Sequence, residues 1–251
     1  MPEQLDIALS FKPASAARRV GLVVLSSDHT TELEFSRLVS PRGVEVFTAR
    51  VEYANPTTPE NLRAMTPHIK TAAASILSGT RLDVIYYSCT AGSVHIGNEA
   101  IINSIHAAKR VNKVITPSTA AVAAFKILGI EKLALLTPYM LETSQPLEPY
   151  FEREAGVEIV RHSCLGLADD CEMARLDSKT LIKAAEMADH HDADGLFISC
   201  TALRAVEIAG DIEKKIGKPV VTSNQAAIWN CLRLIGFDGP EPTDNELFCK
   251  H

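Results

Sequence analysis

Two stretches of the chain repeat one pattern, an apolar run that ends in a Cys-Thr pair. The first, DVIYYSCTA, covers residues 83–91 and contains Cys89, and the second, DGLFISCTA, covers residues 194–202 and contains Cys200. Two more pairs of segments align in the same order: RVGLVVLSS (19–27) with KLALLTPYM (132–140), and VITPSTAAVAAFKILG (114–129) with VVTSNQAAIWNCLRLIG (220–236). Segments that recur in one order predict a chain built from two related halves.

Short apolar runs alternate with longer segments of helical period in both halves. Runs such as GLVVL (21–25) and LALLT (133–137) are apolar throughout, which is typical of strands buried on both faces of a sheet. We expect strands at 19–26, 43–51, 83–88, 113–116, 132–138, 157–163, 194–199 and 219–223, and helices at 30–39, 59–78, 95–109, 118–128, 142–154, 177–189, 203–216 and 224–235. This alternation predicts an α/β fold of two pseudo-symmetric halves, each with a four-stranded parallel sheet covered by helices.

The boundary between the halves is expected near Gly129, which follows a predicted helix as a C-terminal cap does. We therefore expect an N-terminal arm over residues 1–18, a first half over 19–130 and a second half over 131–251. The last long helix, at 224–236, is a candidate to pack onto the first half, because duplicated halves can interlock.

Composition excludes several classes of protein. Hydrophobic residues make up 46% of the 251 residues and charged residues 22%, as in an ordinary globular protein. The net charge of −6 argues against a nucleic-acid partner, whose binding surfaces are usually basic. No apolar run approaches the roughly 18 residues that suggest a membrane span. The N-terminal sequence has no uninterrupted apolar core, so we expect a cytoplasmic protein without a secretory signal, which forms a homo-oligomer.

The chain has six cysteines, and none of them forms a CxxC pair, so we expect no metal site built on thiolates. In the cytosol these thiols stay reduced. Cys164, Cys171, Cys231 and Cys249 are interpreted as small buried or incidental residues.

Cys89 and Cys200 differ from the other four because each lies at a turn from a predicted parallel strand to a predicted helix, within the repeated pattern. Ligands of open parallel sheets bind beyond the carboxyl ends of the strands, close to helix N-termini. Free backbone N–H groups and the helix dipole favour a thiolate there. The small residues that follow, Thr90 with Ala91 and Thr201 with Ala202, leave N–H groups open to a substrate carboxylate or a developing oxyanion.

Two opposed thiols suit a two-base reaction, in which one group removes a proton from a carbon and the other returns a proton on the opposite face. That reaction is a racemisation or epimerisation at a carbon next to a carboxylate, so the predicted partner is a small-molecule carboxylate. Alternatively, one thiolate attacks as a nucleophile while the other exchanges a proton. A third interpretation is that both cysteines are packed core thiols.

Several segments resemble the aspartate/glutamate racemase superfamily. The matching segments are SSDHTTE (26–32), SCTAGS (88–93), LLTPY (135–139), LGLADD (165–170), ISCTALR (198–204) and GKPVVTSNQAAIW (217–229). The resemblance covers nearly all of residues 19–238. It is closest to the branch that contains maleate cis–trans isomerases, arylmalonate decarboxylases and ectoine-utilization protein A, and the HTTE segment inclines it to the ectoine-utilization subgroup.

The resemblance implies two flavodoxin-like domains with the site between them, and an isomerase that needs no cofactor. In maleate isomerases the first cysteine is a nucleophile and the second transfers a proton, and these positions match Cys89 and Cys200. The decarboxylases keep one catalytic cysteine, so a pair disfavours decarboxylation. The tyrosine that contacts the substrate carboxylate in the family matches Tyr139.

Asp28 and Asp170 depart from the family pattern, in which asparagines hold the carboxylates of maleate at these positions. Ionised carboxylates repel a dicarboxylate and attract a cation. We therefore expect a substrate with one carboxylate and a nearby amine or amidinium, such as ectoine, hydroxyectoine or their ring-opened diaminobutyrate derivatives. The plainer interpretation is that either aspartate only caps a helix.

Two other functions stay open at this point. One is a maleate-type cis–trans isomerisation through a covalent cysteine adduct. The other, from a different class, is a non-catalytic ligand-binding protein that keeps the fold without turnover and needs no activated thiol.

Overall fold

Two parallel sheets of four strands each form the centre of the protein, in a computed structural model that describes residues 1–11, 17–239 and 244–251. The first sheet has the order β2-β1-β3-β4 and the second has the order β6-β5-β7-β8. The strands are β1 (Arg19–Leu25), β2 (Glu45–Val51), β3 (Leu82–Ser88), β4 (Val111–Ile115), β5 (Lys132–Tyr139), β6 (Glu158–Leu167), β7 (Gly195–Ile198) and β8 (Val220–Thr222). The identical order confirms the α/β fold and the two equivalent sheets.

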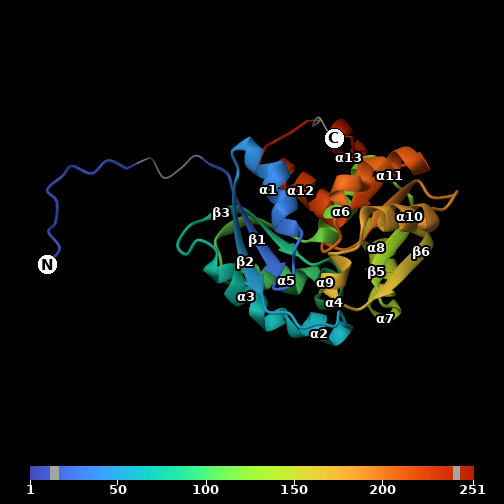
Figure 1. Ribbon diagram of the computed structural model, residues 1–251, viewed down its shortest axis with the longest axis horizontal. Helices are drawn as coiled ribbons and strands as arrows, with labels where there is room; N and C mark the ends of the chain where they lie inside the picture. The colour runs from blue at the N-terminus through green and yellow to red at the C-terminus, as the bar shows by residue number, and fades with distance from the viewer. Residues whose placement is uncertain (12–16, 240–243) are drawn as a thin grey trace.

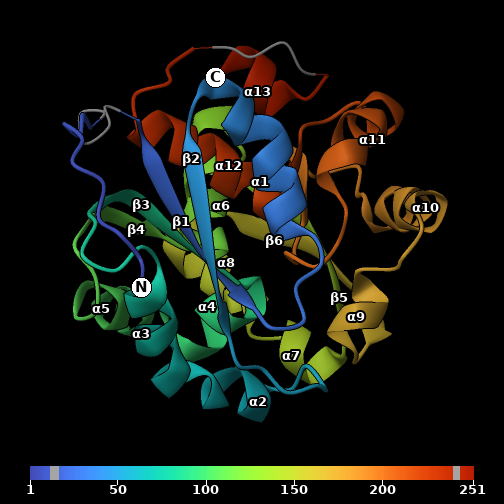
Figure 2. The ribbon, with the colours of Figure 1, turned by 60° about the vertical axis from the view of Figure 1, so that its left-hand side comes forward.

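Helices cover the sheets, as Figures 1 and 2 show. They are α1 (Thr31–Val39), η1 (Ser40–Arg42), α2 (Pro59–Ala64), α3 (Thr66–Ser75), α4 (Thr90–Ile96), α5 (Asn98–His106), α6 (Pro117–Leu128), α7 (Leu141–Ser144), α8 (Leu147–Ala155), α9 (Asp170–Met173), α10 (Ser178–Ala188), η2 (Val206–Ile208), α11 (Ala209–Ile216), α12 (Ser223–Leu234) and α13 (Glu246–Lys250). No helix of the described ranges is both long enough and apolar enough to span a membrane.

The central strands are apolar because both of their faces are covered. In β1 every residue after Arg19 is buried, and β7 is buried throughout. Burial of apolar side chains on both faces is what holds a parallel sheet between helices. The runs 21–25 and 133–137, which the sequence predicts to be buried on both faces, are buried in β1 and β5.

Helices α6 and α12 occupy equivalent places, each directly after the last strand of its sheet. Each begins with a capping box, in which Thr116 or Thr222 accepts a hydrogen bond from the backbone N–H three residues on. The two helices pack against each other, and α12 also packs against α1 and β3 of the first sheet. The last long helix of the second half is thus in contact with the first sheet.

Several predicted helices are wrong in their limits. The expected helix at 59–78 is divided into α2 and α3, because Pro67 lacks an N–H and its ring does not fit a helix interior. The expected helix at 95–109 begins earlier, at Thr90, and is divided at Gly97, whose φ of 95° ends α4. Helices α9 and α13 are additional to the prediction.

In sequence, the strands of the first sheet all precede the predicted boundary at residue 130 and those of the second sheet all follow it. The division into halves itself stays a prediction. Residues 1–11 of the predicted arm have no regular structure and extend away from the body of the protein in Figure 1. Residues 12–16 of the arm and 240–243 of the second half lie outside the described residues.

Candidate active site

Cys89 follows β3 and is the N-cap residue of α4. Its φ of −160° is extended, and its Sγ accepts a hydrogen bond from the Gly92 N–H at 3.2 Å. A Cβ on residue 92 would lie 2.6 Å from the Tyr87 hydroxyl and 3.0 Å from Cys89 Sγ. The close approach of the backbone to the sulfur therefore requires a glycine at position 92.

Cys200 follows β7 in the equivalent place, but its surroundings differ. Its Sγ accepts a hydrogen bond from the Ala202 N–H at 3.3 Å. No helix begins there, because residues 201–205 are irregular and α11 begins only at Ala209, so the expected helix at 203–216 is wrong at its start. The φ of 145° at Cys200 lies in a region that residues other than glycine rarely adopt. Such a conformation costs about 1–3 kcal/mol and is found most often at functional sites.

Ser223, the first residue of α12, connects the two cysteine turns. Its Oγ accepts a hydrogen bond from the backbone N–H of Cys200 at 2.9 Å and another from Thr90 Oγ1 at 2.8 Å. The thiols are also close enough that charge on Cys200 raises the pKa of Cys89. The structure thus brings together the two cysteines that the sequence singled out.

Burial raises the pKa of both thiols. Cys89 is 6% exposed and Cys200 is 4% exposed. Loss of solvation is the largest influence on each: it raises the pKa of Cys200 to about 12 and that of Cys89 well above its ordinary value, while the N–H groups of Gly92 and Ala202 act in the opposite direction. The N–H groups therefore favour the thiolate as expected, but the loss of solvation outweighs them in the ligand-free site.

Asp170 lies beside the candidate site, whereas its neighbour Asp169 caps a helix. Asp169 Oδ1 accepts the hydrogen bond from the Cys171 N–H that begins α9. Asp170 Oδ2 instead accepts a hydrogen bond at 2.5 Å from Ser27 Oγ, in the other half of the chain. Burial raises the pKa of Asp170 to about 6, and its charge raises the pKa of both cysteines.

Asp28 has its hydrogen bonds within its own loop. Oδ1 accepts from the backbone N–H groups of Thr30 and Thr31, each at 2.8 Å, and Oδ2 accepts from Thr31 Oγ1 at 2.7 Å. These contacts satisfy the N-terminus of α1. Burial raises the pKa of Asp28, and its charge raises the pKa of Asp170 and Cys89. Asp28 therefore combines a capping role with a negative charge beside the site.

Tyr139 ends β5 and is 2% exposed. Burial raises the pKa of its phenol well above the ordinary value, and the charges of Cys200 and Cys89 act in the same direction. The Tyr139 hydroxyl in turn favours the thiolate of Cys200. The side chain therefore lies beside the second cysteine.

The predicted donors Thr90, Ala91, Thr201 and Ala202 are all buried. Thr90 Oγ1 donates to Ser223, and Thr201 Oγ1 donates to the carbonyl oxygen of Ser88 at 3.4 Å. Both hydroxyls therefore join the halves. The assignment of these four residues to substrate binding stays a prediction.

Two tyrosines were missed by the sequence analysis. Tyr87 precedes Cys89 by two residues, and its buried hydroxyl has no hydrogen-bond partner within the described part of the chain. Tyr53 follows β2, and the charges of Cys89, Asp170 and Cys200 raise its pKa after the larger influence of burial. Its place just beyond the end of a parallel strand is the only signal that sequence offers for it.

The segment around Tyr53 closes the site from the first half. Thr57 donates its N–H to the carbonyl oxygen of Ala168 at 2.7 Å, and its carbonyl oxygen accepts from Thr143 Oγ1 at 2.8 Å. Asn55 also bonds the Asp170 N–H at 3.1 Å. These contacts join the segment after β2 to the loop that carries Asp170 and to α7.

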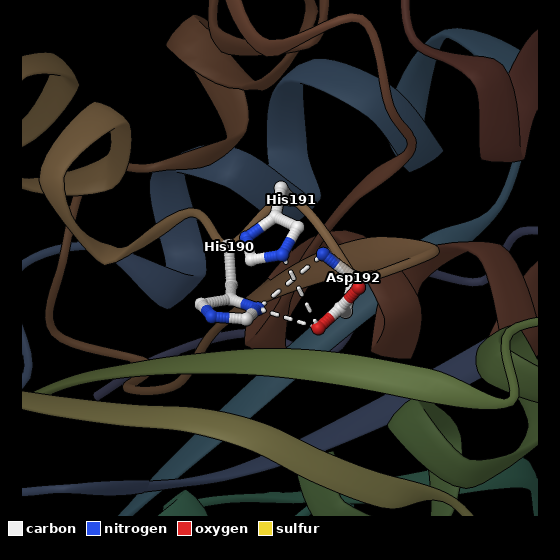
Figure 3. A group of neighbouring side chains, drawn as sticks. All are labelled: His190, His191 and Asp192. Carbon is white, nitrogen blue, oxygen red and sulfur yellow. Dashed lines mark hydrogen bonds and ion pairs between the residues drawn. The ribbon is translucent and has the colours of Figure 1, made fainter.

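A second group of polar side chains lies elsewhere. His190, His191 and Asp192 come close together after α10, with 3.4 Å between His191 Nε2 and Asp192 Oδ2 (Figure 3). They are the one group of three suitable metal donors among the residues that the structure describes. They precede β7 and so lie at the opposite end of that strand from Cys200. We assign them no part in the candidate site.

Fold and site together define an α/β enzyme that holds a pair of buried cysteines between two equivalent sheets. The sequence profile of the arylmalonate decarboxylase family (Amdase) matches residues 57–248. The chain therefore belongs to the arylmalonate decarboxylase family, which confirms the branch that the sequence resembles.

Individual relatives carry two different activities. Arylmalonate decarboxylase of Bordetella bronchiseptica is 34% identical over 125 residues, which are 48% of this chain and 51% of that protein. Maleate isomerase of Nocardia farcinica is 27% identical over 226 residues, which are 86% of this chain and 89% of that protein.

The solved structures agree in fold. Maleate isomerase Iso from Pseudomonas putida S16 has a TM-score of 0.82 at 24% identity, and the match covers 92% of this chain and 98% of that one. A cysteine-to-serine mutant of Nocardia farcinica maleate cis–trans isomerase, with a covalently bound succinylcysteine intermediate, has a TM-score of 0.79 at 25% identity and covers 88% and 93% of the two chains.

Proposed function

We propose that the protein is an isomerase of the racemase or epimerase type, which moves a proton at a carbon next to a carboxylate. The observation that carries this proposal is the pair of buried thiols at equivalent strand ends, connected by one hydroxyl, that of Ser223. Two acid/base groups from opposite halves are what inversion at carbon requires.

The reaction needs one thiolate and one thiol. The thiolate takes the proton from carbon, the electron pair of the C–H bond moves toward the adjacent carboxylate, and the second thiol donates its proton to the opposite face and becomes the thiolate. Protons and charge balance, and the two sulfurs exchange protonation states. In the reverse direction Cys89 and Cys200 exchange roles.

A cationic substrate supplies what the ligand-free site lacks. Burial keeps both thiols neutral, and an ammonium or amidinium group within the pocket would lower their pKa values. Asp170 and Asp28 give the pocket two acidic groups where a cation would bind. We therefore propose a substrate related to ectoine or hydroxyectoine, or a diaminobutyrate derivative of either, held at its carboxylate by Tyr139 and by the N–H groups after each cysteine.

Hydrogen exchange in deuterated water tests this function. The protein is incubated with ectoine, hydroxyectoine, diaminobutyrate derivatives and maleate, and NMR follows each carbon-bound hydrogen. Deuterium incorporation with inversion supports the proposal, and absence of exchange with every cationic compound contradicts it. Boiled protein and the Cys89→Ser, Cys200→Ser double variant are the controls.

A maleate-type cis–trans isomerisation is the second candidate. It is supported by the relatives that are maleate isomerases, one of which was captured as a succinylcysteine intermediate. In this case Cys89 attacks the double bond and Cys200 exchanges the proton. Mass spectrometry of the Cys200→Ser variant after incubation with maleate would show an adduct on Cys89, and NMR would show fumarate from the unmodified chain.

Turnover also separates an enzyme from a ligand-binding protein of the same fold. Exchange or isomerisation of a compound that binds favours the enzyme, whereas binding without either favours the ligand-binding protein. The cytoplasmic location and the homo-oligomer remain parts of the proposal, and size-exclusion chromatography with light scattering tests the latter.

A further inference from the structure

A cavity that is separate from the candidate active site lies among α1, η2, α11, α12 and the C-terminal helix α13. Its volume is about 220 Å³, and none of the predicted catalytic or substrate-binding residues lines it. Leu38, Val206 and Phe248 give it an apolar wall. Figure 2 shows α1, α12 and α13 grouped on this side of the protein. A cavity of this size is large enough for a small organic molecule rather than for water alone.

The polar part of the wall is acidic. Glu34, Glu207, Asp211 and Asp244 all line the cavity, whereas Arg37 is the one cationic residue among the described residues of the lining. Arg37 already pairs with Glu207. Lys214 pairs with Asp244 at 2.9 Å and with Asp211 at 4.0 Å. Glu34 is therefore the one carboxyl group of the lining without an ion pair among the described residues, and a cationic occupant would pair with it.

Glu34 is the buried member of this acidic group. It is 4% exposed, and its Oε1 has no hydrogen-bond partner within the described residues. Burial raises the pKa of its carboxyl to about 8, while the Asn224 amide and the Val206 backbone N–H act in the opposite direction. A buried carboxyl group with one oxygen unsatisfied is costly, and an N–H donor from a ligand would remove that cost.

Glu34 is also connected to the turn that carries Cys200. Its Oε2 accepts a hydrogen bond at 2.7 Å from Asn224 Nδ2, and the same amide donates to the carbonyl oxygen of Thr201 at 2.9 Å. Asn224 Oδ1 accepts from Tyr86 at 3.1 Å, so the amide is held on both sides. A change in the position or charge of Glu34 would therefore be transmitted through the Asn224 side chain to Thr201, which follows Cys200.

We propose that this cavity is a second binding site, which takes a small organic ammonium ion and adjusts the active site through Glu34 and Asn224. The ammonium group donates to the free oxygen of Glu34, and the apolar body lies against Val206 and Phe248. The binding part of this inference is independent of the proposed reaction. Its second part concerns the same cysteines and is measured without turnover.

Isothermal titration of the full chain with n-butylammonium chloride tests the binding. We expect one class of sites at the cavity, and no binding of sodium butyrate, which has a similar body and the opposite charge. The titration is done at pH 9, where Glu34 is ionised and the ammonium ion is still charged. Glu34→Gln keeps the acceptor for Asn224 and removes the charge, so affinity should fall about tenfold, the size of one charge-assisted hydrogen bond. The matched control is Glu99→Gln, an exposed residue on α5.

A second variant keeps the test decisive if Glu34→Gln folds poorly. Val206→Phe fills the cavity without changing a charge, and it should abolish the binding. Absence of n-butylammonium binding to the unmodified chain, or binding that both variants leave unchanged, would overturn the proposal.

The rate of iodoacetamide alkylation at Cys200 measures the coupling. We expect n-butylammonium to change that rate in the unmodified chain and in Asp170→Asn, but not in Val206→Phe. An effect lost in Asp170→Asn and kept in Val206→Phe would place the ion in the active site and overturn the inference. Failure of the substrate tests above would leave this result unaffected.

Discussion

The turns that carry Cys89 and Cys200 occupy equivalent places in two equivalent sheets, yet they are built differently. Cys89 has an extended backbone and caps a helix, whereas Cys200 has a φ of 145° and is followed by irregular chain. Burial is nearly equal at the two positions. The two turns therefore share the burial of the sulfur but differ in the local backbone. We infer that the two thiols share a reaction but differ in ease of ionisation.

The largest effect should come from removing either sulfur. Cys89→Ser or Cys200→Ser should each lower racemisation about a thousandfold, the scale of a lost acid/base group, because a hydroxyl is a far weaker acid than a thiol. Single-turnover exchange in deuterated water should then persist for one enantiomer in the first variant and for the other enantiomer in the second. If either single variant racemises at the rate of the unmodified protein, the two cysteines do not share the reaction.

The next effect concerns the third residue after each cysteine. In the first half this residue must be Gly92, because a Cβ would collide with the Tyr87 hydroxyl and Cys89 Sγ. In the second half the equivalent residue is the buried Leu203. Gly92→Ala should cost about 1–3 kcal/mol in the free energy of unfolding, as overpacking does. Urea denaturation measures it, with Leu203→Met as a conservative control. An unchanged denaturation midpoint in Gly92→Ala would mean that the first turn has room for a side chain at this position, as the second turn does.

The third effect distinguishes Asp170, which we expect to bind the substrate, from Asp28, which we expect mainly to cap α1. Asp170→Asn should weaken binding of a diaminobutyrate ligand about tenfold, while Asp28→Asn should mainly lower stability by about 1 kcal/mol, as a weakened helix cap does. Because burial raises the pKa of Asp170 to about 6, its carboxylate is charged above that pH and neutral below it. Affinity for the cation should therefore rise as pH increases through about 6, and this dependence should flatten in Asp170→Asn. Calorimetry at several pH values checks both; equal losses of affinity in the two variants would contradict it.

The smallest effect is a difference in stability between glycine and alanine variants, which should have opposite signs at positions 200 and 89. At Cys200 a glycine should be more stable than an alanine by about 1 kcal/mol, because only glycine adopts that φ freely. At Cys89 the alanine should be more stable than the glycine by a similar amount, because an extended residue gains nothing from the freedom of glycine. Denaturation of the four variants measures this. The same sign at both positions would show that the backbone difference has no energetic consequence.

The strands were predictable from apolar runs, and the equivalence of the two sheets was predictable from the internal repeat. The Thr58 cap and Pro59 at the start of α2 were also predictable, since both act within one turn of helix. The helix expected directly after Cys200 was not observed, because the contacts of Thr201 and Ala202 with the first half override local preference.

The site was predictable in its cysteines and not in its electrostatics. Sequence shows that N–H groups lie near each sulfur, but the loss of solvation that outweighs them depends on the whole fold. The adjacent pair Asp169 and Asp170 gave no sign of which residue caps a helix. Tyr53 and Ser223 reach the site through tertiary contacts that no local pattern encodes.

Ser223 has one more consequence. Its single oxygen accepts from Thr90 in one half and from Cys200 in the other, so neither half is complete without the same atom. A gene split at the midpoint would yield a first fragment that lacks the acceptor for Thr90 and the amide of Asn224 that accepts from Tyr86. The two halves are thus structurally interdependent, and a substitution at Ser223 would alter the surroundings of both cysteines at once.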